Sequence, residues 1–349
     1  RAISKRKNYR LTEETLINEN HCMNIRDTRI ETVQWVFPRH ANILGTLYGG
    51  RMMAWITENA SLVASRVAKG PVILGSMDDV DFLSPVKVGH IVTLRGEVEY
   101  IGKSSMEVGV YVLREDPEGG DTAVATVAHL AYVAVDSRAK PREIRAKIEP
   151  GDREELRIFE SAKVRREARR ERLREGKKKA REIVLPDSHL RYRFTYSRLV
   201  FPDDAYFGNV MYAGRLLLDL DQAAAVLARR FTRGPIVTAS MDAMDFYSPI
   251  YVGNIVNLHL AVQYVGNTSL EIGVRVLAED PFTGELRHTT TSYLTFVHMD
   301  EEGRPKSIMS YFRPETEIEE TLWREALRRK EKRRERVKEL RERLKRGIF

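Results

Sequence analysis

The chain repeats itself, and this repeat limits its possible folds more than any other feature of the sequence. The segment GPVILGSMDDVDFLSPVKVGHIV, which starts at Gly70, recurs as GPIVTASMDAMDFYSPIYVGNIV from Gly234, 164 residues later. The same offset separates Pro38 from Pro202, Tyr48 from Tyr212, Gly102 from Gly266 and Pro150 from Pro314. A fixed period over so long a stretch indicates a duplicated domain.

The length of 349 residues fits about two domains. We predict five parts: an N-terminal extension (1–28), a first domain (29–150), a basic helical linker (151–190), a second domain (191–314) and a basic C-terminal helix (315–349).

Each copy reads as one long helix followed by consecutive strands. In the first copy the stretch Asn42–Arg66 begins as a loop and continues as a helix to about Val67, where Gly70–Pro71 breaks it. The predicted strands, which short turns separate, are Arg29–Phe37, Val72–Phe82, Ile91–Ile101, Met106–Glu115 and Thr122–Val135. This order predicts an α+β fold in which an antiparallel sheet wraps a helix, rather than βαβ units.

A charged helix trails each copy, near Glu154–Arg181 and Glu315–Lys345. Arg and Glu recur in both at helical spacing, which is typical of a solvated, salt-bridged helix. The chain carries a net charge of +8, so a nucleic-acid partner has to be considered. Both helices interleave Glu with Arg and have few aromatic residues that could stack on bases, which argues against binding of single strands.

Composition excludes several classes of protein. Cys22 is the single cysteine, so no disulfide framework forms within the chain, and no Cys/His cluster has metal-ligand spacing. No apolar run approaches the ~20 residues that span a bilayer. We therefore expect a soluble, cytoplasmic protein without a metal or redox cofactor.

The helix entry carries the chemistry. Tyr48–Gly49–Gly50 precedes the first long helix, and the first N–H groups of a helix lack partners and carry partial positive charge. With no Cβ at Gly49 or Gly50, a substrate carbonyl could approach the backbone, and a developing oxyanion would be stabilised there. The second copy has Tyr212–Ala213–Gly214 at the same place.

Together these residues resemble the hot-dog acyl-CoA thioesterases, in particular the tandem long-chain acyl-CoA hydrolases. The resemblance covers roughly 29–150 and 193–314. Its motifs are Ala41–Asn42 with Tyr48–Gly49–Gly50, Asp81–Phe82–Leu83–Ser84–Pro85 with Gly89, and Gly102–Lys103–Ser104–Ser105–Met106–Glu107. The family usually has His-Gly-Gly where this chain has Tyr48–Gly49–Gly50 and Tyr212–Ala213–Gly214.

The resemblance implies an active site between the two domains. Asn42 matches the family's loop asparagine, Gly49 its oxyanion donor and Asp221 its helical acid. The residues support Asp221 independently, because the positions three and four residues away on its helix are apolar: Leu217, Leu218, Ala224 and Ala225. A carboxylate there is unfavourable unless it is paired or functional.

The mirrored site is broken. Tyr206 stands at the position of Asn42, and Thr57 stands at the position of Asp221. A threonine cannot act as a general base as an aspartate does. We therefore expect one working site in each chain.

Other candidates carry weaker signals. We predict substrate contacts at Gly50 and at two hairpin turns that the family places near the CoA phosphates, Lys103–Ser104–Ser105 and Asn267–Thr268–Ser269, although plain turns explain these almost as well. Thr238 could orient a water molecule or simply be a strand hydroxyl. Asp81 and Asp245 read as turn or cap residues.

The resemblance implies an acyl-CoA thioesterase that releases free fatty acid and CoA, with CoA entering only as part of the substrate. It also implies a homotrimer of tandem domains. Three alternatives stay open: a hot-dog hydratase or dehydratase, a non-catalytic acyl-CoA binder, and a nucleic-acid binder. The hydratase reaction usually needs a histidine beside an acid, and only His40 lies near the loop.

Overall fold

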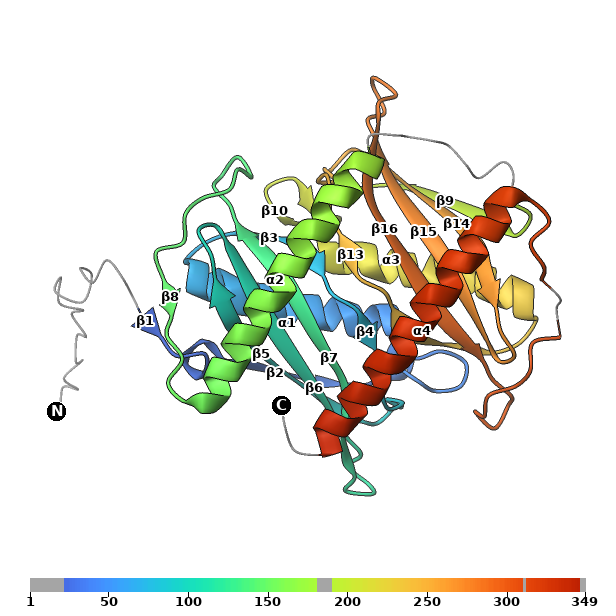
Figure 1. The fold of residues 1–349 in the computed structure, drawn as a ribbon, viewed down its shortest axis with the longest axis horizontal. Helices are drawn as coiled ribbons and strands as arrows, with labels where there is room; N and C mark the ends of the chain where they lie inside the picture. Colours follow the sequence, from blue (N-terminus) through green and yellow to red (C-terminus); the bar gives the residue numbers. More distant parts are fainter. Residues whose placement is uncertain (1–21, 181–189, 310–311, 346–349) are drawn as a thin grey trace, which may run out of the picture.

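The computed structural model describes residues 22–180, 190–309 and 312–345, with the side chains of 177–180 left out. Most of the predicted N-terminal extension lies outside this part of the chain. The described elements form three layers: α1 (Gly49–Ala68) and α3 (Ala213–Thr232) lie on one side of the sheets, and α2 (Arg153–Ala180) and α4 (Glu317–Lys345) lie on the other (Figure 1). None of the described helices is long and apolar enough to cross a membrane.

Each half contains the predicted antiparallel sheet. The first sheet has the order β13-β3-β7-β6-β5-β2 and the second has the order β4-β12-β16-β15-β14-β9. The strands of the first half are β2 (Ile30–Trp35), β3 (Val72–Met77), β4 (Val80–Asp81), β5 (Ile91–Ile101), β6 (Ser105–Glu115) and β7 (Thr122–Ala134). Those of the second half are β9 (Arg193–Leu199), β12 (Ile236–Met241), β13 (Met244–Asp245), β14 (Ile255–Val265), β15 (Ser269–Glu279) and β16 (Leu286–His298).

Short elements complete the fold. β1 (Cys22–Met23) pairs with β8 (Lys147–Ile148), and β10 (Ala205–Phe207) pairs with β11 (Val210–Met211). Single 3₁₀ turns lie at Arg26–Thr28, Pro38–His40 and Pro202–Asp204.

The prediction of one strand over Val72–Phe82 is wrong. The chain leaves the first sheet after β3, and β4 pairs with β12 of the second sheet, Asp81 opposite Ser240. β13 crosses back in the same way and pairs with β3. The two domains therefore exchange short strands, and repeat symmetry makes the exchange reciprocal. Periodicity within one segment could not reveal a strand whose partner lies in the other domain.

The core lies between the two long helices and the inner faces of the sheets. α1 and α3 contact each other as well as their own sheets. Their inward side chains, such as Met53, Ile56, Leu217 and Leu220, are completely buried. This packing places the beginning of each helix against the helix of the other domain.

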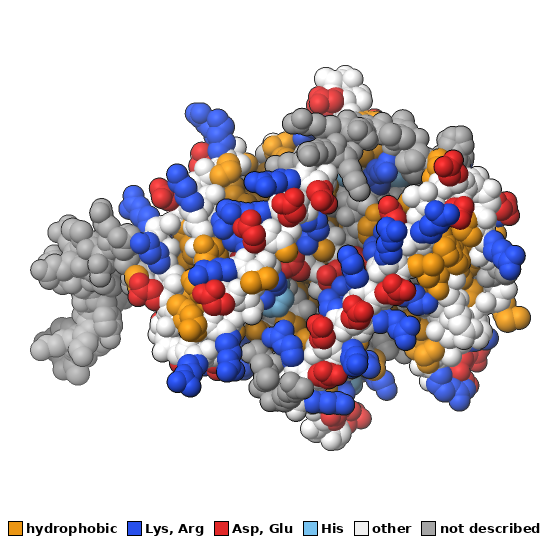
Figure 2. Space-filling view, in the orientation of Figure 1, with side chains coloured by type: hydrophobic (Ala, Val, Ile, Leu, Met, Phe, Trp, Pro, Cys, Tyr) orange, Lys and Arg blue, Asp and Glu red, His pale blue; other side chains and the backbone are white. Residues whose placement is uncertain are grey.

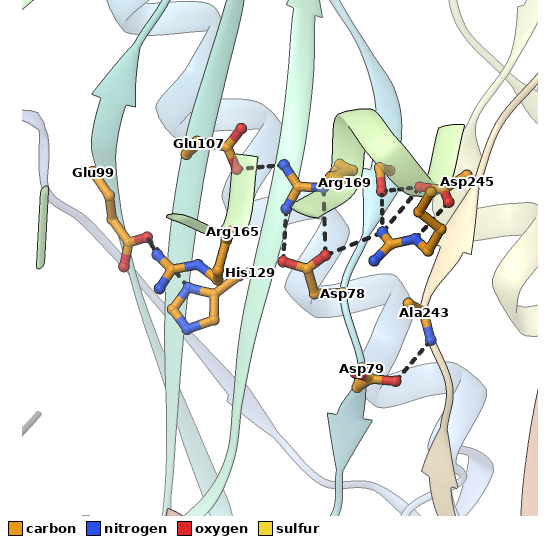
Figure 3. A network of polar contacts seen from close by, with 11 residues as sticks. Asp78, Asp79, Glu99, Glu107, His129, Arg165, Arg169, Ala243 and Asp245 are labelled. Carbon is orange, nitrogen blue, oxygen red and sulfur yellow. Dashed lines mark hydrogen bonds and ion pairs between the residues drawn. The ribbon is translucent and has the colours of Figure 1, made fainter. Parts of the chain in front are cut away.

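The charged helices α2 and α4 are not simply solvated, and that interpretation of the sequence needs correction. Their outer faces carry interleaved acidic and basic side chains (Figure 2). Their inner faces direct arginines onto buried carboxylates of the sheets. Arg169 pairs with Asp78 at 2.6 Å and with Glu107 at 2.5 Å, and its side chain is 4% exposed (Figure 3).

These pairs also join the two domains. Arg172 of α2 contacts Asp245 in β13 at 2.6 Å, and Arg336 of α4 contacts Asp81 in β4 at 2.6 Å. The two pairs occupy equivalent positions in the repeat. Asp81 and Asp245 are therefore buried partners of the opposite domain's strand and of a trailing helix, and the prediction of turn or cap residues is wrong.

Candidate functional site

The beginning of α1 meets the middle of α3 at Asp221. Asp221 is fully buried, and its Oδ2 accepts a hydrogen bond of 2.9 Å from the Gly50 N–H. Its Oδ1 accepts one of 2.8 Å from the Thr238 hydroxyl on β12. The carboxylate of the second domain thus lies at the N-terminus of the first domain's helix, where the helix dipole favours negative charge.

Close packing explains the two glycines at this helix entry. A Cβ on Gly49 would lie 2.7 Å from the Thr238 Cβ, and a Cβ on Gly50 would lie 2.7 Å from the Asp221 Cβ. Either distance is shorter than any ordinary contact between carbon atoms. The glycines therefore allow α1 to reach Asp221 and Thr238. These two side chains fill the space beside the glycines that the sequence analysis assigned to an approaching carbonyl.

Burial raises the pKa of Asp221 above its ordinary value, and the hydrogen bonds from Gly50 and Thr238 lower it less than burial raises it. A carboxylate of raised pKa is a better proton acceptor. Asp219, two residues away, instead lies in ion pairs with Arg198 at 2.7 Å and Arg215 at 3.3 Å. No basic side chain forms an ion pair with Asp221 within the described residues, so its charge is left available for chemistry.

Asn42 lies in the loop before α1, and its amide is divided between two roles. Its Oδ1 accepts hydrogen bonds from the Leu44 N–H at 2.9 Å, the Thr46 N–H at 3.2 Å and the Thr46 hydroxyl at 3.0 Å. The amide Nδ2 has no partner in the described part of the chain. The Gly49 N–H is likewise free of a partner there. These are the two donors that the sequence assigned to an oxyanion.

The structure therefore brings Gly49, Gly50, Asp221 and Thr238 together. The sequence does not predict the direct Thr238–Asp221 contact, since a hydroxyl at Thr238 fits equally well one that orients water or one that bonds within its strand. The signal was available: Thr238 lies in the second copy, where Leu74 occupies its position in the first. The copy that has Asp221 therefore also has a polar residue, Thr238, where the other copy has the apolar Leu74.

The two predicted hairpin turns lie in different places. Thr238 on β12 pairs with Phe296 on β16, and Phe296 pairs with Leu270 on β15. Leu270, the neighbour of Ser269, is therefore two strands away from Thr238, about 10 Å. Met106 lies in the matching row with Tyr132 and Leu74, beside the broken site. The turn Asn267–Thr268–Ser269 thus belongs to the sheet that carries Thr238, and Lys103–Ser104–Ser105 belongs to the sheet that carries Leu74 of the broken site.

A basic groove adjoins Ser269 on the side of the sheet that α4 covers, which is the side opposite to α3. It has a volume of about 500 Å³ and is lined by Ser269 and by α4 residues, among them Lys330, Arg334, Lys338, Arg341 and Lys345. Cations in this number suit phosphate groups. The other turn, in contrast, packs Gly102 against the guanidinium of Arg166.

The mirrored position holds no acid. Thr57 is completely buried, and its hydroxyl donates to the Met53 carbonyl one helical turn earlier. Tyr206, at the place of Asn42, shares a hydrogen bond of 2.8 Å with Ser65. Within the described residues no cluster of three or more His, Cys, Asp or Glu side chains could hold a metal ion.

Comparisons with known proteins agree with this architecture. The model of the "Thioesterase superfamily" matches twice, at 44–120 and 208–284. Protein VdlD of Helicobacter pylori is 42% identical over 147 residues, which cover 42% of this chain and 83% of that protein. The human "Cytosolic acyl coenzyme A thioester hydrolase" is 28% identical over 303 residues, which cover 82% of this chain and 79% of that protein.

A solved structure also matches part of the chain. An acyl-CoA hydrolase from Staphylococcus aureus, crystallised with butyryl coenzyme A and coenzyme A, is 33% identical with a TM-score of 0.43. The match covers 45% of this chain and 96% of that one. The predicted family, the tandem hot-dog fold and the thioesterase class of enzyme are confirmed. This chain belongs to the thioesterase superfamily and carries two of its hot-dog domains in tandem.

Proposed function

We propose that the chain hydrolyses fatty acyl-CoA to free fatty acid and CoA at one site, between the N-terminus of α1 and Asp221 of α3. The observation that carries this proposal is the buried Asp221 carboxylate, held by the Gly50 N–H and the Thr238 hydroxyl beside a helix mouth with free donors. A thiol-release assay with acyl-CoAs of different chain length tests it. Absence of release from every acyl-CoA would overturn it.

The geometry suggests the following division of work. The Gly49 N–H and the Asn42 amide donate to the thioester carbonyl and stabilise the oxyanion that forms. Asp221 takes a proton from water, which adds to the carbonyl carbon, and the tetrahedral intermediate then expels the CoA thiolate. Direct attack by Asp221, which would form an anhydride that water then opens, uses the same donors.

The structure weakens two alternatives. His40, the histidine that a hydratase would need, packs edge-on against Trp55 and Phe37 at ring distances of 5.2 and 5.7 Å. For a nucleic-acid binder, α2 and α4 would need an outer face that is basic throughout, yet acidic side chains interleave there (Figure 2), and the inward Arg169 and Arg333 bind carboxylates of the sheets. We also propose a cytoplasmic location, in line with the name of the human relative.

Thr57→Ala tests whether one site does the work. Thr57 hydrogen-bonds within its own helix, and its loss removes no proton acceptor from the Asp221 site. We expect turnover to stay within about threefold of wild type in the thiol-release assay. A folded Thr57→Ala protein without turnover would contradict the single site, and circular dichroism provides the check on folding.

Arg336→Met tests how α4 supports the site. Arg336 holds Asp81, Asp81 lies opposite Ser240, and the neighbouring Phe82 N–H donates to the Ala239 carbonyl at 3.0 Å. Ala239 follows Thr238 directly, at an irregularity of β12. Loss of Arg336 leaves a buried carboxylate unpaired, so we expect about 3 kcal/mol less stability. We also expect about tenfold lower kcat, because Thr238 is misplaced.

The repeat supplies a matched control for this prediction. Arg172 makes the equivalent pair with Asp245, which holds β13 against β3 beside Leu74 of the broken site. Arg172→Met should lower the melting temperature in the same way but leave kcat unchanged where the protein is folded. If the two variants lose kcat equally, α4 does not position Thr238 and the effect is general destabilisation.

We further propose assembly as a homotrimer of tandem domains. The edge strands expose large apolar side chains: Trp35 at the end of β2 is 59% exposed, Leu199 at the end of β9 is 47% exposed, and Phe201 just after β9 is 58% exposed. Apolar residues on unpaired edges are typical of surfaces that another subunit covers. Light scattering should give about three times the chain mass of 40.2 kDa. Trp35→Glu should reduce this value, and a stable wild-type monomer at micromolar concentration would contradict the trimer.

A further inference from the structure

A pocket survives at the broken site. It has a volume of about 330 Å³ and lies between α1, β3 and β7 of the first domain and the entry to α3 of the second. The five residues that occupy the places of Asn42, Tyr48, Gly49, Asp221 and Thr238 all line it: Tyr206, Tyr212, Ala213, Thr57 and Leu74. The duplicated chain has therefore kept the cavity while losing the acid.

The walls of this pocket, which we call the remnant pocket, carry no charge. Hydrocarbon surface comes from side chains such as Val133, Leu216 and Phe246, and the side-chain polar groups are all hydroxyls. Asp, Glu, Lys, Arg and His are absent from the lining residues. A phosphate or carboxylate inside would lose its hydration without gaining a counter-charge, which is unfavourable. An uncharged, largely apolar ligand fits these walls.

The hydroxyls include one buried donor for such a ligand, that of Tyr212. The Tyr132 hydroxyl donates to the Thr57 carbonyl at 3.0 Å and accepts from Ser61 at 3.1 Å. The Tyr212 hydroxyl is buried beside Ser61 and makes no well-formed hydrogen bond with any described residue. Burial raises the pKa of Tyr212, so the phenol keeps its proton. A buried donor without a partner is unfavourable, and a ligand carbonyl would satisfy it.

We propose that the remnant pocket binds the acyl-thioester end of a second acyl-CoA molecule without cleaving it, with the Tyr212 O–H donating to the thioester carbonyl. This inference rests on the proposed function, since it takes the same substrate. A volume of about 330 Å³ holds on the order of ten heavy atoms at ~30 Å³ each. The carbonyl and a medium-length chain would enter, and the charged nucleotide would stay outside.

The ligand would persist because its surroundings cannot hydrolyse it. Thr57 replaces the acid, and its hydroxyl is already donated to the Met53 carbonyl. Leu74 replaces the threonine that holds the acid in the other site. The lining therefore offers no proton acceptor that could activate water. Binding without turnover follows from the same substitutions that broke the site.

Isothermal titration of the full chain with a ketone analogue of octanoyl-CoA, in which a methylene group separates the sulfur from the carbonyl, tests the proposal. We expect two analogue molecules per chain, whereas CoA alone should fill only the Asp221 site. Tyr212→Phe should weaken one of the two binding events about tenfold, since one neutral hydrogen bond is lost. Tyr48→Phe, the matched change at the entry to α1, should leave that event unaltered.

A second variant locates the event independently. Ala213→Leu enlarges a side chain that lines the remnant pocket, so the stoichiometry should fall from two to one while thiol release continues at the wild-type rate. One analogue per chain in an active wild-type enzyme, or two in Ala213→Leu, would overturn the second site. CoA alone filling both sites would overturn the acyl-thioester assignment. An enzyme that releases no thiol would instead overturn the proposed function.

Discussion

Asp221→Asn should lower kcat for acyl-CoA hydrolysis about 10³-fold while CoA still binds. The amide keeps the size of the carboxylate. Its oxygen can accept the hydrogen bond from the Gly50 N–H while its NH2 group donates to the Thr238 hydroxyl, but it cannot take a proton from water or act as a nucleophile. Thiol release gives the rate, and titration with CoA gives the affinity. Turnover near the wild-type value would remove Asp221 from the mechanism.

The same variant should be at least as stable as the wild-type protein. The folded-state pKa of Asp221 is raised by burial, so its contribution to stability is present below the unfolded pKa and is lost as the pH rises through the folded pKa. At neutral pH the ionised side chain therefore destabilises the fold, and the neutral amide relieves this. A melting temperature equal to or above wild type shows that the lost activity is not caused by unfolding.

The raised pKa also sets the acid limb of the pH profile. Only the ionised carboxylate accepts a proton, so kcat should rise with pH through the folded pKa of Asp221 and then level off. That midpoint should lie above the ordinary value of an aspartate. An acid limb centred at the ordinary aspartate value would mean that the side chain is solvated in the working enzyme.

The burial of Asp221 could be predicted from the sequence, because its neighbours three and four residues away on the helix are apolar. Its choice as the acid of the site came from the family resemblance, which this apolar stripe supports. The end of the first helix was equally clear, since α1 ends at Ala68 and the predicted breakers Gly70 and Pro71 follow its C-cap, Lys69. Such features can be predicted because they depend on the local spacing of apolar residues and on residues that break a helix.

Contacts between the two domains could not be predicted in this way. β4 is two residues long and has no pattern of its own, and only the structure shows that Asp81 faces Ser240 across the domain boundary. The charged helices misled for a related reason. Their composition is that of a solvated helix, but the partners of Arg169 and Arg336 are buried carboxylates on strands far away in the sequence.

Asn42→Ala should lower kcat by about 10²–10³, the usual effect of removing one oxyanion donor. In the structure the two polar atoms of the Asn42 side chain have different surroundings. Its Oδ1 orders the loop through Leu44 and Thr46, and its Nδ2 is the group that can reach a substrate. Alanine removes both Oδ1 and Nδ2, so this variant by itself does not say which of the two atoms matters for the reaction.

Asn42→Asp separates the two roles. A carboxylate at this position still accepts the hydrogen bonds from Leu44 and Thr46, so the loop keeps its order, but the donor is gone and a negative charge faces the developing oxyanion. If the donor acts in the transition state, Asn42→Asp should lose kcat at least as strongly as Asn42→Ala, with little change in KM.

Thr46→Val supplies the complementary change. It removes the hydroxyl that donates to Asn42 Oδ1 but keeps the Thr46 backbone N–H bond and leaves the free Nδ2 in place. We expect kcat within about threefold of wild type, because losing one neutral hydrogen bond perturbs the loop by only ~1 kcal/mol. An active Asn42→Asp enzyme combined with an inactive Thr46→Val enzyme would make Asn42 a residue that shapes the loop, and the oxyanion would then depend on the helix mouth at Gly49.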